Sequence, residues 1–233
     1  MAIDLRTVPP DKQTYEMCYD SVMTDWRQLR YVSAKNQTEE MCLKAVRQSG
    51  CALQYIEEQT PELCLTAVKQ FGGSLQYVQH KTPEICAVAV EQYENALEYV
   101  PEELQTPEMC LEAVKKNVWL LKYAKKQTSE MCFKAVRERG MILEYVKEQT
   151  PELCFEAIKE DRKALQYVRE QTPEICLAAV KLDGNTLKYI RNQTPEICLA
   201  AIKRNAFALG SVKEQTRELC LTAVQQHGYA CNT

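Results

Sequence analysis

Apolar residues recur along this chain in two alternating patterns. In the first, they stand 3, 4, 5, 7 and 8 positions after a threonine, as in residues 172–180. These spacings place side chains on one side of an α-helix. In the second, a motif of the form A-L-x-Y-V follows a few residues later, as in residues 52–56. We therefore predict a long helix, a tight turn, a short helical segment and a polar link, repeated along the chain.

The threonines divide the sequence into ten repeats. Most of them are 22 residues apart, and the two longer spacings each hold two extra residues in the connection, near 33–36 and 101–104. The repeats themselves are therefore expected to be intact. Repeats 1 to 10 begin at Thr14, Thr38, Thr60, Thr82, Thr106, Thr128, Thr150, Thr172, Thr194 and Thr216.

Each threonine is expected to be the N-cap of a long helix of about three turns. Proline follows it in six repeats, and glutamate stands two positions after it in all ten. Proline has the fixed φ of a first helical turn, and a carboxylate there meets the positive end of the helix dipole. Glycine follows the helix in five repeats and is expected to end it in the left-handed conformation. These glycines are Gly50, Gly72, Gly140, Gly184 and Gly228.

The apolar positions of the long helix cover roughly 200° of its circumference, at about 100° per residue. Such a helix needs neighbours on several sides, which stacked copies of the same hairpin supply. We predict an all-α fold, a right-handed α-solenoid of about ten 22-residue helix-turn-helix repeats. Residues 1–13 would form an N-terminal segment and residues 14–233 a single helical-repeat array.

The two ends of the array depart from the pattern. Repeat 1 carries Tyr15, Tyr19, Ser21 and Trp26 where other repeats mostly have Pro, Leu, Ala and Gly. Terminal repeats are often atypical because one side meets water. At the other end, residues 228–233 stand where the short helix of repeat 10 should begin. We therefore expect the last long helix to lack that partner.

The alternation of A-L-x-Y-V with C-L-x-A-V-K-x-x-G over residues 14–228 resembles a known family. It is similar to the short tandem helical repeats of the domain of unknown function numbered forty-one-sixteen. The resemblance implies an all-helical repeat protein without an established activity. The Thr-Pro-Glu start and the tighter period depart from the usual form of that family.

Composition narrows the function classes. The chain has 233 residues, 45% of them hydrophobic, and a formal net charge of −3. This charge argues against a general nucleic-acid binder, which needs a basic excess to displace counterions. No secretory signal and no run of 18 apolar residues is present, so we expect a cytoplasmic protein without membrane association, or one exported by a route without a Sec-type signal. Twelve cysteines in such a chain indicate reduced thiols.

A cysteine stands four residues after every threonine. Equivalent helices 8 to 10 Å apart are too distant for disulfides between these residues, and a regular ladder does not gather four ligands around one zinc ion. We expect the cysteines to be buried as small apolar side chains, and we expect no metal and no cofactor. The ladder comprises Cys18, Cys42, Cys64, Cys86, Cys110, Cys132, Cys154, Cys176, Cys198 and Cys220.

A tyrosine row and a glutamine row accompany the cysteines. The tyrosines of the short helices should lie at the border of the apolar face, with the hydroxyl wet. Structural support is one interpretation, and a binding groove bordered by Tyr99, Tyr123 and Tyr145 is the other. Glutamine precedes the threonine in nine repeats, with Lys81 as the exception. We expect these glutamines to make polar contacts between loops.

Repeat 5 breaks the pattern most visibly, because residues 115–126 read KKNVWLLKYAKK. Trp119 and Met141 occupy the same position in consecutive repeats, near Lys115, Lys122 and Lys125. Aromatic anchors among cations are typical of interaction hot spots, although Trp119 could instead fill a turn that lacks glycine. The preceding repeat is acidic, with Glu91, Glu94, Glu98, Glu102 and Glu103.

No nucleophile and base, phosphate-binding loop or metal-binding motif stands out, and the chain has only two histidines. We expect a non-catalytic scaffold that binds a protein or peptide. The alternatives are binding of nucleic acid or another polyanion around Trp119, and self-assembly through the C-terminal repeat.

Overall fold

The computed structural model describes residues 3–227, and all regular secondary structure in that part of the chain is helical. Each of the ten threonines is followed by an α-helix of ten residues, about 15 Å long. These helices are α1 Tyr15–Thr24, α2 Glu39–Gln48, α3 Pro61–Gln70, α4 Pro83–Gln92, α5 Pro107–Lys116, α6 Ser129–Glu138, α7 Pro151–Glu160, α8 Pro173–Leu182, α9 Pro195–Arg204 and α10 Arg217–Gln226.

The threonine caps explain why every α-helix begins where it does. In each repeat the threonine is extended, and its hydroxyl oxygen accepts the N–H of the residue three positions on, at 3.1 to 3.4 Å. This bond satisfies an N–H that the first helical turn leaves without a partner. The predicted N-caps are therefore confirmed in all ten described repeats.

The second element of each repeat is a 3₁₀ helix. Two further 3₁₀ turns, η4 Ala34–Asn36 and η8 Glu102–Leu104, account for the extra residues of the two longer repeats, and two precede α1. The 3₁₀ helices of repeats 1 to 9 are η3 Trp26–Tyr31, η5 Gly50–Tyr55, η6 Gly72–Tyr77, η7 Glu94–Tyr99, η9 Val118–Lys122, η10 Gly140–Tyr145, η11 Arg162–Tyr167, η12 Gly184–Tyr189 and η13 Ala206–Ser211. The two that precede α1 are η1 Leu5–Thr7 and η2 Pro10–Lys12.

The prediction of left-handed glycines is wrong, since no described residue has a positive φ. Each α-helix ends at an extended residue, such as Ser49, whose N–H still bonds a helix carbonyl. The glycine that follows is instead needed because it lets two consecutive repeats pack closely. A Cβ on Gly50 would lie 2.5 Å from the carbonyl oxygen of Ala67 in the next repeat. The same approach, at 2.3 to 2.4 Å, occurs at Gly72, Gly140 and Gly184, and Gly228 lies outside the described residues.

The buried face of each α-helix is narrower than expected. The positions 3, 4, 7 and 8 after the threonine are buried, as Ile175, Cys176, Ala179 and Val180 illustrate. Leu177, at the fifth position, is only half-buried. The apolar arc is therefore about 140° rather than 200°. The reason is that the helix contacts α-helices on two sides and 3₁₀ helices on a third, while the fourth side faces solvent.

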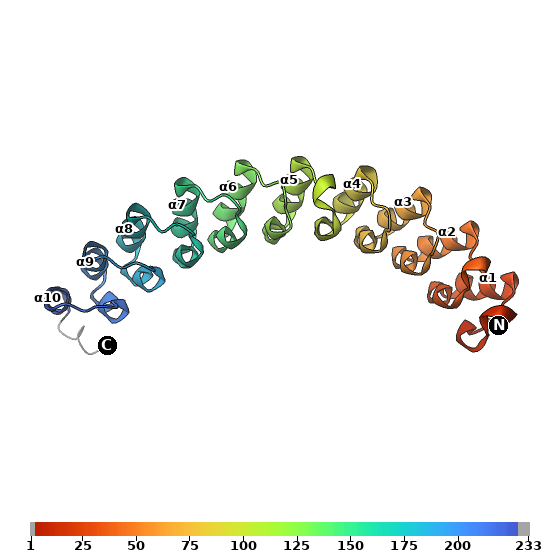
Figure 1. Ribbon diagram of the computed structural model, residues 1–233, viewed down its shortest axis with the longest axis horizontal. Helices are drawn as coiled ribbons and strands as arrows, with labels where there is room; N and C mark the ends of the chain where they lie inside the picture. Colours follow the sequence, from red (N-terminus) through yellow and green to blue (C-terminus); the bar gives the residue numbers. More distant parts are fainter. Residues whose placement is uncertain (1–2, 228–233) are drawn as a thin grey trace. The chain divides into compact units, whose positions relative to one another are not determined.

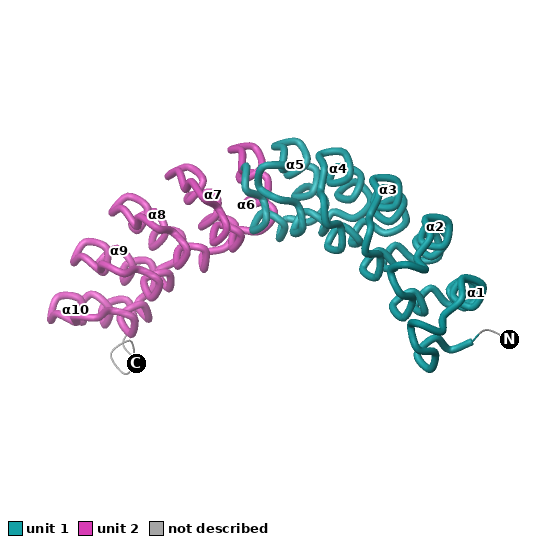
Figure 2. Tube along the Cα trace, turned by 45° about the vertical axis from the view of Figure 1, so that its right-hand side comes forward, with its two compact units in different colours: residues 1–126 teal, residues 127–233 magenta. Residues whose placement is uncertain are grey.

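The chain divides into two compact units, unit 1 of residues 1–126 and unit 2 of residues 127–233. Unit 1 holds α1 to α5, and unit 2 holds α6 to α10. In each unit, successive α-helices lie side by side, and successive 3₁₀ helices form a second row beneath them (Figures 1 and 2). Each repeat thus packs against its neighbours in sequence, which is the arrangement of an all-α repeat solenoid.

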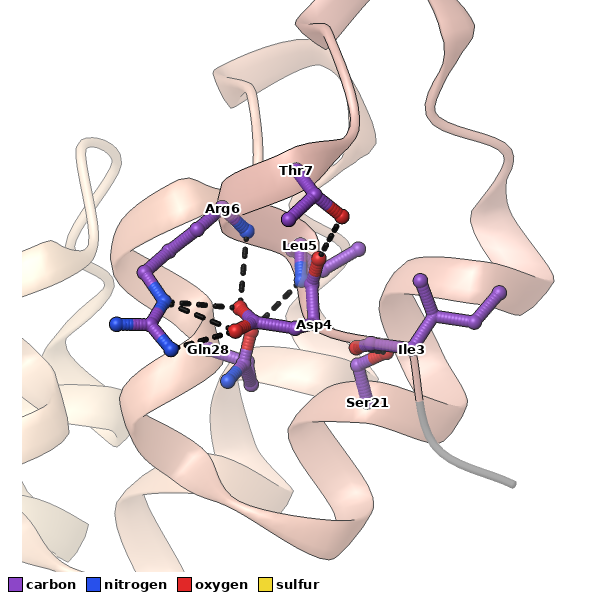
Figure 3. A network of polar contacts seen from close by, with 7 residues as sticks. All are labelled: Ile3, Asp4, Leu5, Arg6, Thr7, Ser21 and Gln28. Atoms are coloured by element: carbon purple, nitrogen blue, oxygen red, sulfur yellow. Dashed lines mark hydrogen bonds and ion pairs between the residues drawn. The ribbon is translucent and has the colours of Figure 1, made fainter.

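The N-terminal segment covers the exposed side of repeat 1 in place of a preceding repeat. Leu5 is buried there, and its N–H donates to Oε1 of Gln28 at 3.0 Å (Figure 3). Ser21 stands where other repeats have alanine, and its hydroxyl donates to the carbonyl of Ile3 at 2.7 Å. Of the atypical residues of repeat 1, Ser21 therefore serves this contact.

The last described helix, α10, leaves apolar side chains in solvent. Leu221 is 52% exposed and Val224 is 41% exposed. The expected absence of a partner short helix concerns residues 228–233, which lie outside the described residues.

Candidate functional site: the groove between α4 and α5

A glutamine clamp links the second helices of successive repeats. The side-chain amide of Gln149 donates to the carbonyl of Leu143 in η10 and to that of Tyr167 in η11, both at 3.0 Å. Its Oε1 accepts the N–H of Arg169 at 2.9 Å. The predicted polar contacts between loops are therefore three specific bonds to the backbone. The same three bonds recur at Gln13, Gln37, Gln59, Gln105, Gln171 and Gln193.

Repeat 4 has lost this clamp through two matched changes. Lys81 replaces the glutamine, and its ammonium group donates to the carbonyl of Val78 at 3.0 Å. The residue 20 positions after a clamp glutamine supplies an N–H, as Ser33 does to Gln13. At this place repeat 4 has Pro101, which carries no N–H. The connection from repeat 4 to α5 therefore begins without the clamp that holds other connections.

Repeat 4 also lacks the glycine that allows close packing. Its equivalent is Glu94, the first residue of η7. In the four described repeats that have glycine here, this residue approaches the carbonyl of an alanine in the next α-helix, and a side chain there would collide. Consistently, α4 and α5 are packed less closely than α3 and α4. Met109, on the side of α5 toward α4, is half-buried, whereas the equivalent Ile85 is buried.

A groove with a cavity volume of about 670 Å³ runs between α4 and α5. Its apolar lining consists of Ala87, Val90, Leu104, Met109 and Ala113. Ala87 deepens it, because the same position carries tyrosine, leucine or phenylalanine in all nine other repeats. Leu104 belongs to the extra turn η8, so the two inserted residues contribute to the lining. Two departures of repeat 4 from the common pattern, Ala87 and the inserted turn that holds Leu104, therefore meet at one groove.

The rim of the groove is acidic. Glu84 and Glu91 lie along α4, and Glu108 and Glu112 along α5, all with exposed side chains. Glu112 forms an ion pair with Lys115 at 2.6 Å. The one lysine of the lining, Lys116, donates to the carbonyl of Glu91 at 3.2 Å. Residues 82–114 contain eight glutamates and no lysine, arginine, aspartate or histidine.

The equivalent place between α1 and α2 is filled by the protein itself. Tyr19 stands at the position of Ala87, and its hydroxyl donates to Glu40 at 3.3 Å. Lys44, at the position of Glu112, donates to the same hydroxyl, and its ammonium group lies 5.1 Å from the centre of the ring. One junction thus carries its own aromatic side chain and cation, while the other has an alanine and a glutamate.

The residues predicted around Trp119 follow the groove residues in sequence, but they are not part of its lining and make other contacts. Trp119 is 42% exposed on η9, and its backbone N–H donates to Oδ1 of Asn117. The buried residue of this turn is Val118, and filling of the turn by the Trp119 side chain stays a prediction. Lys115 pairs with Glu112, as described above. The role of Trp119 in binding remains a prediction.

Of the other predicted cations, Lys122 lies over the ring of Tyr123 at 4.5 Å, and the backbone N–H of Lys125 joins the clamp of Gln105 at 2.8 Å. Met141 is half-buried at the second position of η10. It belongs to unit 2 and Trp119 to unit 1, so their expected neighbourhood stays a prediction.

The tyrosine row occupies the border position expected from the sequence, since all eight rings are half-buried. The pKa of Tyr99 is raised, first by burial and then by Glu98 and by neighbouring tyrosines that include Tyr77 and Tyr123. Tyr145 belongs to unit 2. Half-buried rings fit structural support of the 3₁₀ helices, and both this role and the binding role of the tyrosines stay predictions.

The cysteine ladder lies in the core. Nine of its thiols are buried and Cys220 is half-buried, and the cysteines of the described residues are not joined in disulfides. Burial raises the pKa of Cys42, Cys86, Cys132 and Cys154 to about 11. Several of the thiols also lie within reach of the clamp glutamine, as Cys110 does at 3.3 Å from Oε1 of Gln105. The cysteine is therefore a weak donor to the clamp as well as a small apolar side chain.

The described part of the chain holds neither a metal-binding cluster nor a membrane-spanning helix. Within residues 3–227, no three histidine, cysteine, aspartate or glutamate side chains gather as they would around a metal ion. In the same part of the chain, every helix is too short or too polar to cross a bilayer.

The sequence alone does not single out the groove, although its signals are visible there. Ala87 replaces a tyrosine, leucine or phenylalanine, Lys81 replaces a glutamine that all other repeats carry, and Pro101 takes a position where the other repeats have no proline. The acidic residues of this repeat are noticeable in the sequence, but Trp119 is the more conspicuous deviation and attracts the prediction of an anchor. A comparison of equivalent positions across all repeats is the signal that identifies the α4–α5 junction.

Comparison with known proteins gives a family without an assigned activity. The family described as Domain of unknown function (DUF4116) matches residues 38–81, 60–105, 82–128, 106–150 and 172–217. These overlapping segments each span about two repeats, and together they cover well over half of the chain. No curated protein and no solved structure matches. The chain therefore belongs to the family described as Domain of unknown function (DUF4116), and its tandem repeats are the two-helix repeats described above.

Proposed function

We propose that this chain is a non-catalytic scaffold that binds a segment of another protein in the groove between α4 and α5. The observation that carries this proposal is the groove itself, an apolar lining that the common repeat pattern would have filled. A volume of about 670 Å³ is within the range of natural binding sites. Exposed apolar surface of this kind on a protein is usually a site of interaction.

The geometry gives less support to the alternatives. A polyanion site around Trp119 would need available cations, but Lys115 is paired with Glu112 and Lys122 lies over an aromatic ring. The adjacent groove is acidic and would repel a nucleic acid. A catalytic site would need a nucleophile and a base within hydrogen-bond reach, and the lining of the groove offers carboxylates and a lysine on an open rim.

The test is a selection from a random peptide library displayed on phage, with the full chain as the target. Ala87→Leu restores the residue of other repeats, so it should fold and fill the groove. We expect the wild-type chain to select peptides that lose binding to Ala87→Leu. The matched control is Ala178→Leu, which adds the same side chain to α8 at a half-buried position in unit 2. It should retain the peptides.

Two outcomes contradict the proposal. One is a selection that yields no peptide with reproducible affinity for the wild-type chain. The other is a set of peptides that bind Ala87→Leu as tightly as the wild-type chain, because those peptides would occupy a different surface.

A further inference from the structure

The chemistry of the groove also indicates what occupies it, provided that the proposed function is correct. We propose that the occupant is a cationic amphipathic helix that inserts a bulky apolar side chain against Ala87. The inference rests on the charge of the rim, the nature of the lining and the comparison between the α4–α5 and α1–α2 junctions.

The rim selects for positive charge. Glu84, Glu91 and Glu108 surround an apolar strip, and Lys116 is the one cation of the lining, so the carboxylates outnumber it. Carboxylates on two neighbouring helices that line one groove raise the local negative potential. A segment with lysine or arginine beside its apolar residues would relieve this repulsion, whereas an acidic segment would add to it.

The lining selects for a helix rather than an extended strand. It is formed by side chains of α4 and α5 together with Leu104, and the N–H and C=O groups inside an α-helix already bond each other. An extended peptide would therefore leave its own backbone groups without partners against an apolar surface. A helix satisfies its backbone internally. From Glu84 to Glu91 the groove is about 10 Å long, which matches about two helical turns.

The α1–α2 junction provides a template for the contact. There, Tyr19 lies between the two α-helices and accepts a hydrogen bond from the ammonium group of Lys44. At the α4–α5 junction the corresponding residues are Ala87 and Glu112, so both the ring and the cation are missing from the chain. A partner that supplies a large apolar side chain and a cation would reproduce the contact. Met109 gives the lining a flexible side chain that adapts to the inserted group.

The experiment uses a fluorescein-labelled 15-residue helical peptide with phenylalanine and leucine on one face and lysines beside them. Fluorescence anisotropy measures its affinity for the full chain. We expect binding that weakens when salt is raised from about 0.05 M to about 0.5 M, because the charges lie at an open rim. Replacing the lysines of the peptide by glutamates, or its phenylalanine by alanine, should each lower the affinity by at least about tenfold.

Charge and shape of the groove are then varied on the protein. Glu84→Gln with Glu108→Gln should lower the affinity for the lysine peptide by about tenfold. The matched control is Glu174→Gln with Glu196→Gln, which removes the same two helix-start charges from α8 and α9 and should leave the affinity unchanged. Ala87→Tyr with Glu112→Lys copies the α1–α2 junction and should abolish binding while circular dichroism shows an intact helical fold.

The outcomes separate this inference from the proposed function. If the library selects neutral or acidic peptides that depend on Ala87, the groove is a binding site but the cationic occupant is wrong. If the lysine peptide binds equally to the Glu84→Gln, Glu108→Gln variant and to the control, the acidic rim has no role and the inference also fails. If no peptide depends on Ala87, both proposals fail together.

Discussion

Because Gly140 has no side chain, repeat 6 can pack closely against repeat 7. Its backbone adopts no unusual conformation, yet a Cβ there would lie 2.3 Å from the carbonyl oxygen of Ala157 and 3.0 Å from the backbone nitrogen of Asp161. Both atoms are backbone atoms of α7 or of its C-cap. Rotation of a flexible side chain therefore cannot make room for the Cβ, and the helix itself would have to shift. The glycine is therefore required by the packing between repeats.

Gly140→Ala should consequently destabilise the protein by about 2 to 4 kcal/mol, because the two repeats must separate to admit one methyl group. The measurement is the free energy of unfolding in urea. Gly210→Ala is the control, since Gly210 is exposed at a position where other repeats carry glutamine, glutamate, lysine or arginine. It should be neutral or slightly stabilising. Equal losses in both variants would contradict the packing argument.

The buried thiols give the stability a dependence on pH. Burial raises the pKa of Cys42, Cys86, Cys132 and Cys154 from 9.0 to about 11. Below pH 9 these thiols are protonated in the folded and the unfolded chain alike. Between pH 9 and 11 the unfolded chain loses their protons while the folded chain retains them. The raised pKa therefore stabilises nothing extra at neutral pH and weakens the fold as the solution becomes alkaline.

We expect the free energy of unfolding to fall from pH 9 to pH 11, by up to about 2 kcal/mol for each of these thiols. Urea unfolding at several pH values measures the fall. In Cys154→Ala the free energy of unfolding should decrease less between pH 9 and pH 11, because this thiol no longer contributes. The variant is also less stable than the wild-type chain at pH 7. An identical pH profile in the variant and the wild-type chain would show that Cys154 does not contribute.

At the scale of the element, two kinds of interaction hold each repeat. The threonine cap is local, since it joins residues three positions apart, and it starts every described α-helix. The glutamine clamp joins residues 18 to 20 positions apart and links one 3₁₀ helix to the next. Because a 3₁₀ helix of six residues has few internal bonds, the clamp supplies much of its order.

Gln149→Ala should lower the free energy of unfolding by about 2 kcal/mol, since it leaves the carbonyls of Leu143 and Tyr167 and the N–H of Arg169 without their partner. Urea unfolding measures the loss, and amide hydrogen exchange should increase first at Arg169. Gln225→Ala, at an exposed position of α10, serves as the control and should cost less than about 0.5 kcal/mol. A loss no larger than that of the control would mean that water replaces the clamp.

The sequence predicts the elements that depend on local signals and misses those that depend on neighbours. A threonine with glutamate two positions later, as at Thr172 and Glu174, indicates a helix start in every repeat, so all ten starts are predicted correctly. Glycine is favoured both by a left-handed helix end and by close packing, and the sequence of one repeat does not distinguish the two. The groove depends on several substitutions that face one another across two repeats, so it becomes visible only with the structure.

At the scale of the molecule, a weak junction between two repeats has little to compensate for it. Within each unit the described repeats contact their neighbours in sequence, so the stability of a unit is close to a sum of repeats and junctions. In unit 1, repeat 4 combines the lost clamp, the replaced glycine and the longer connection. The α4–α5 region should therefore open more readily than the α2–α3 region, and this freedom would help the groove adapt to its partner.

Restoring the clamp tests this view of the molecule. Repeat 1 has the same longer connection and keeps the clamp, with Gln13 bonded to the N–H of Ser33 at 3.2 Å. Lys81→Gln with Pro101→Ser copies that arrangement into repeat 4. We expect the free energy of unfolding of the double variant to be higher by about 1 to 2 kcal/mol. The introduced glutamine can donate two hydrogen bonds to backbone carbonyls and accept one from the backbone N–H of residue 101.

Each single change should gain less than half of this increase. In Lys81→Gln alone, Pro101 still offers no N–H to the new glutamine. In Pro101→Ser alone, the new N–H finds no glutamine oxygen to accept it. Each single variant therefore has an incomplete clamp. Hydrogen exchange monitored by mass spectrometry should show slower exchange in residues 94–105 of the double variant and no change in α2 and α3. If exchange slows evenly along unit 1, the junctions are not independent. If exchange does not slow at all in 94–105, the missing clamp is not what makes this connection weak.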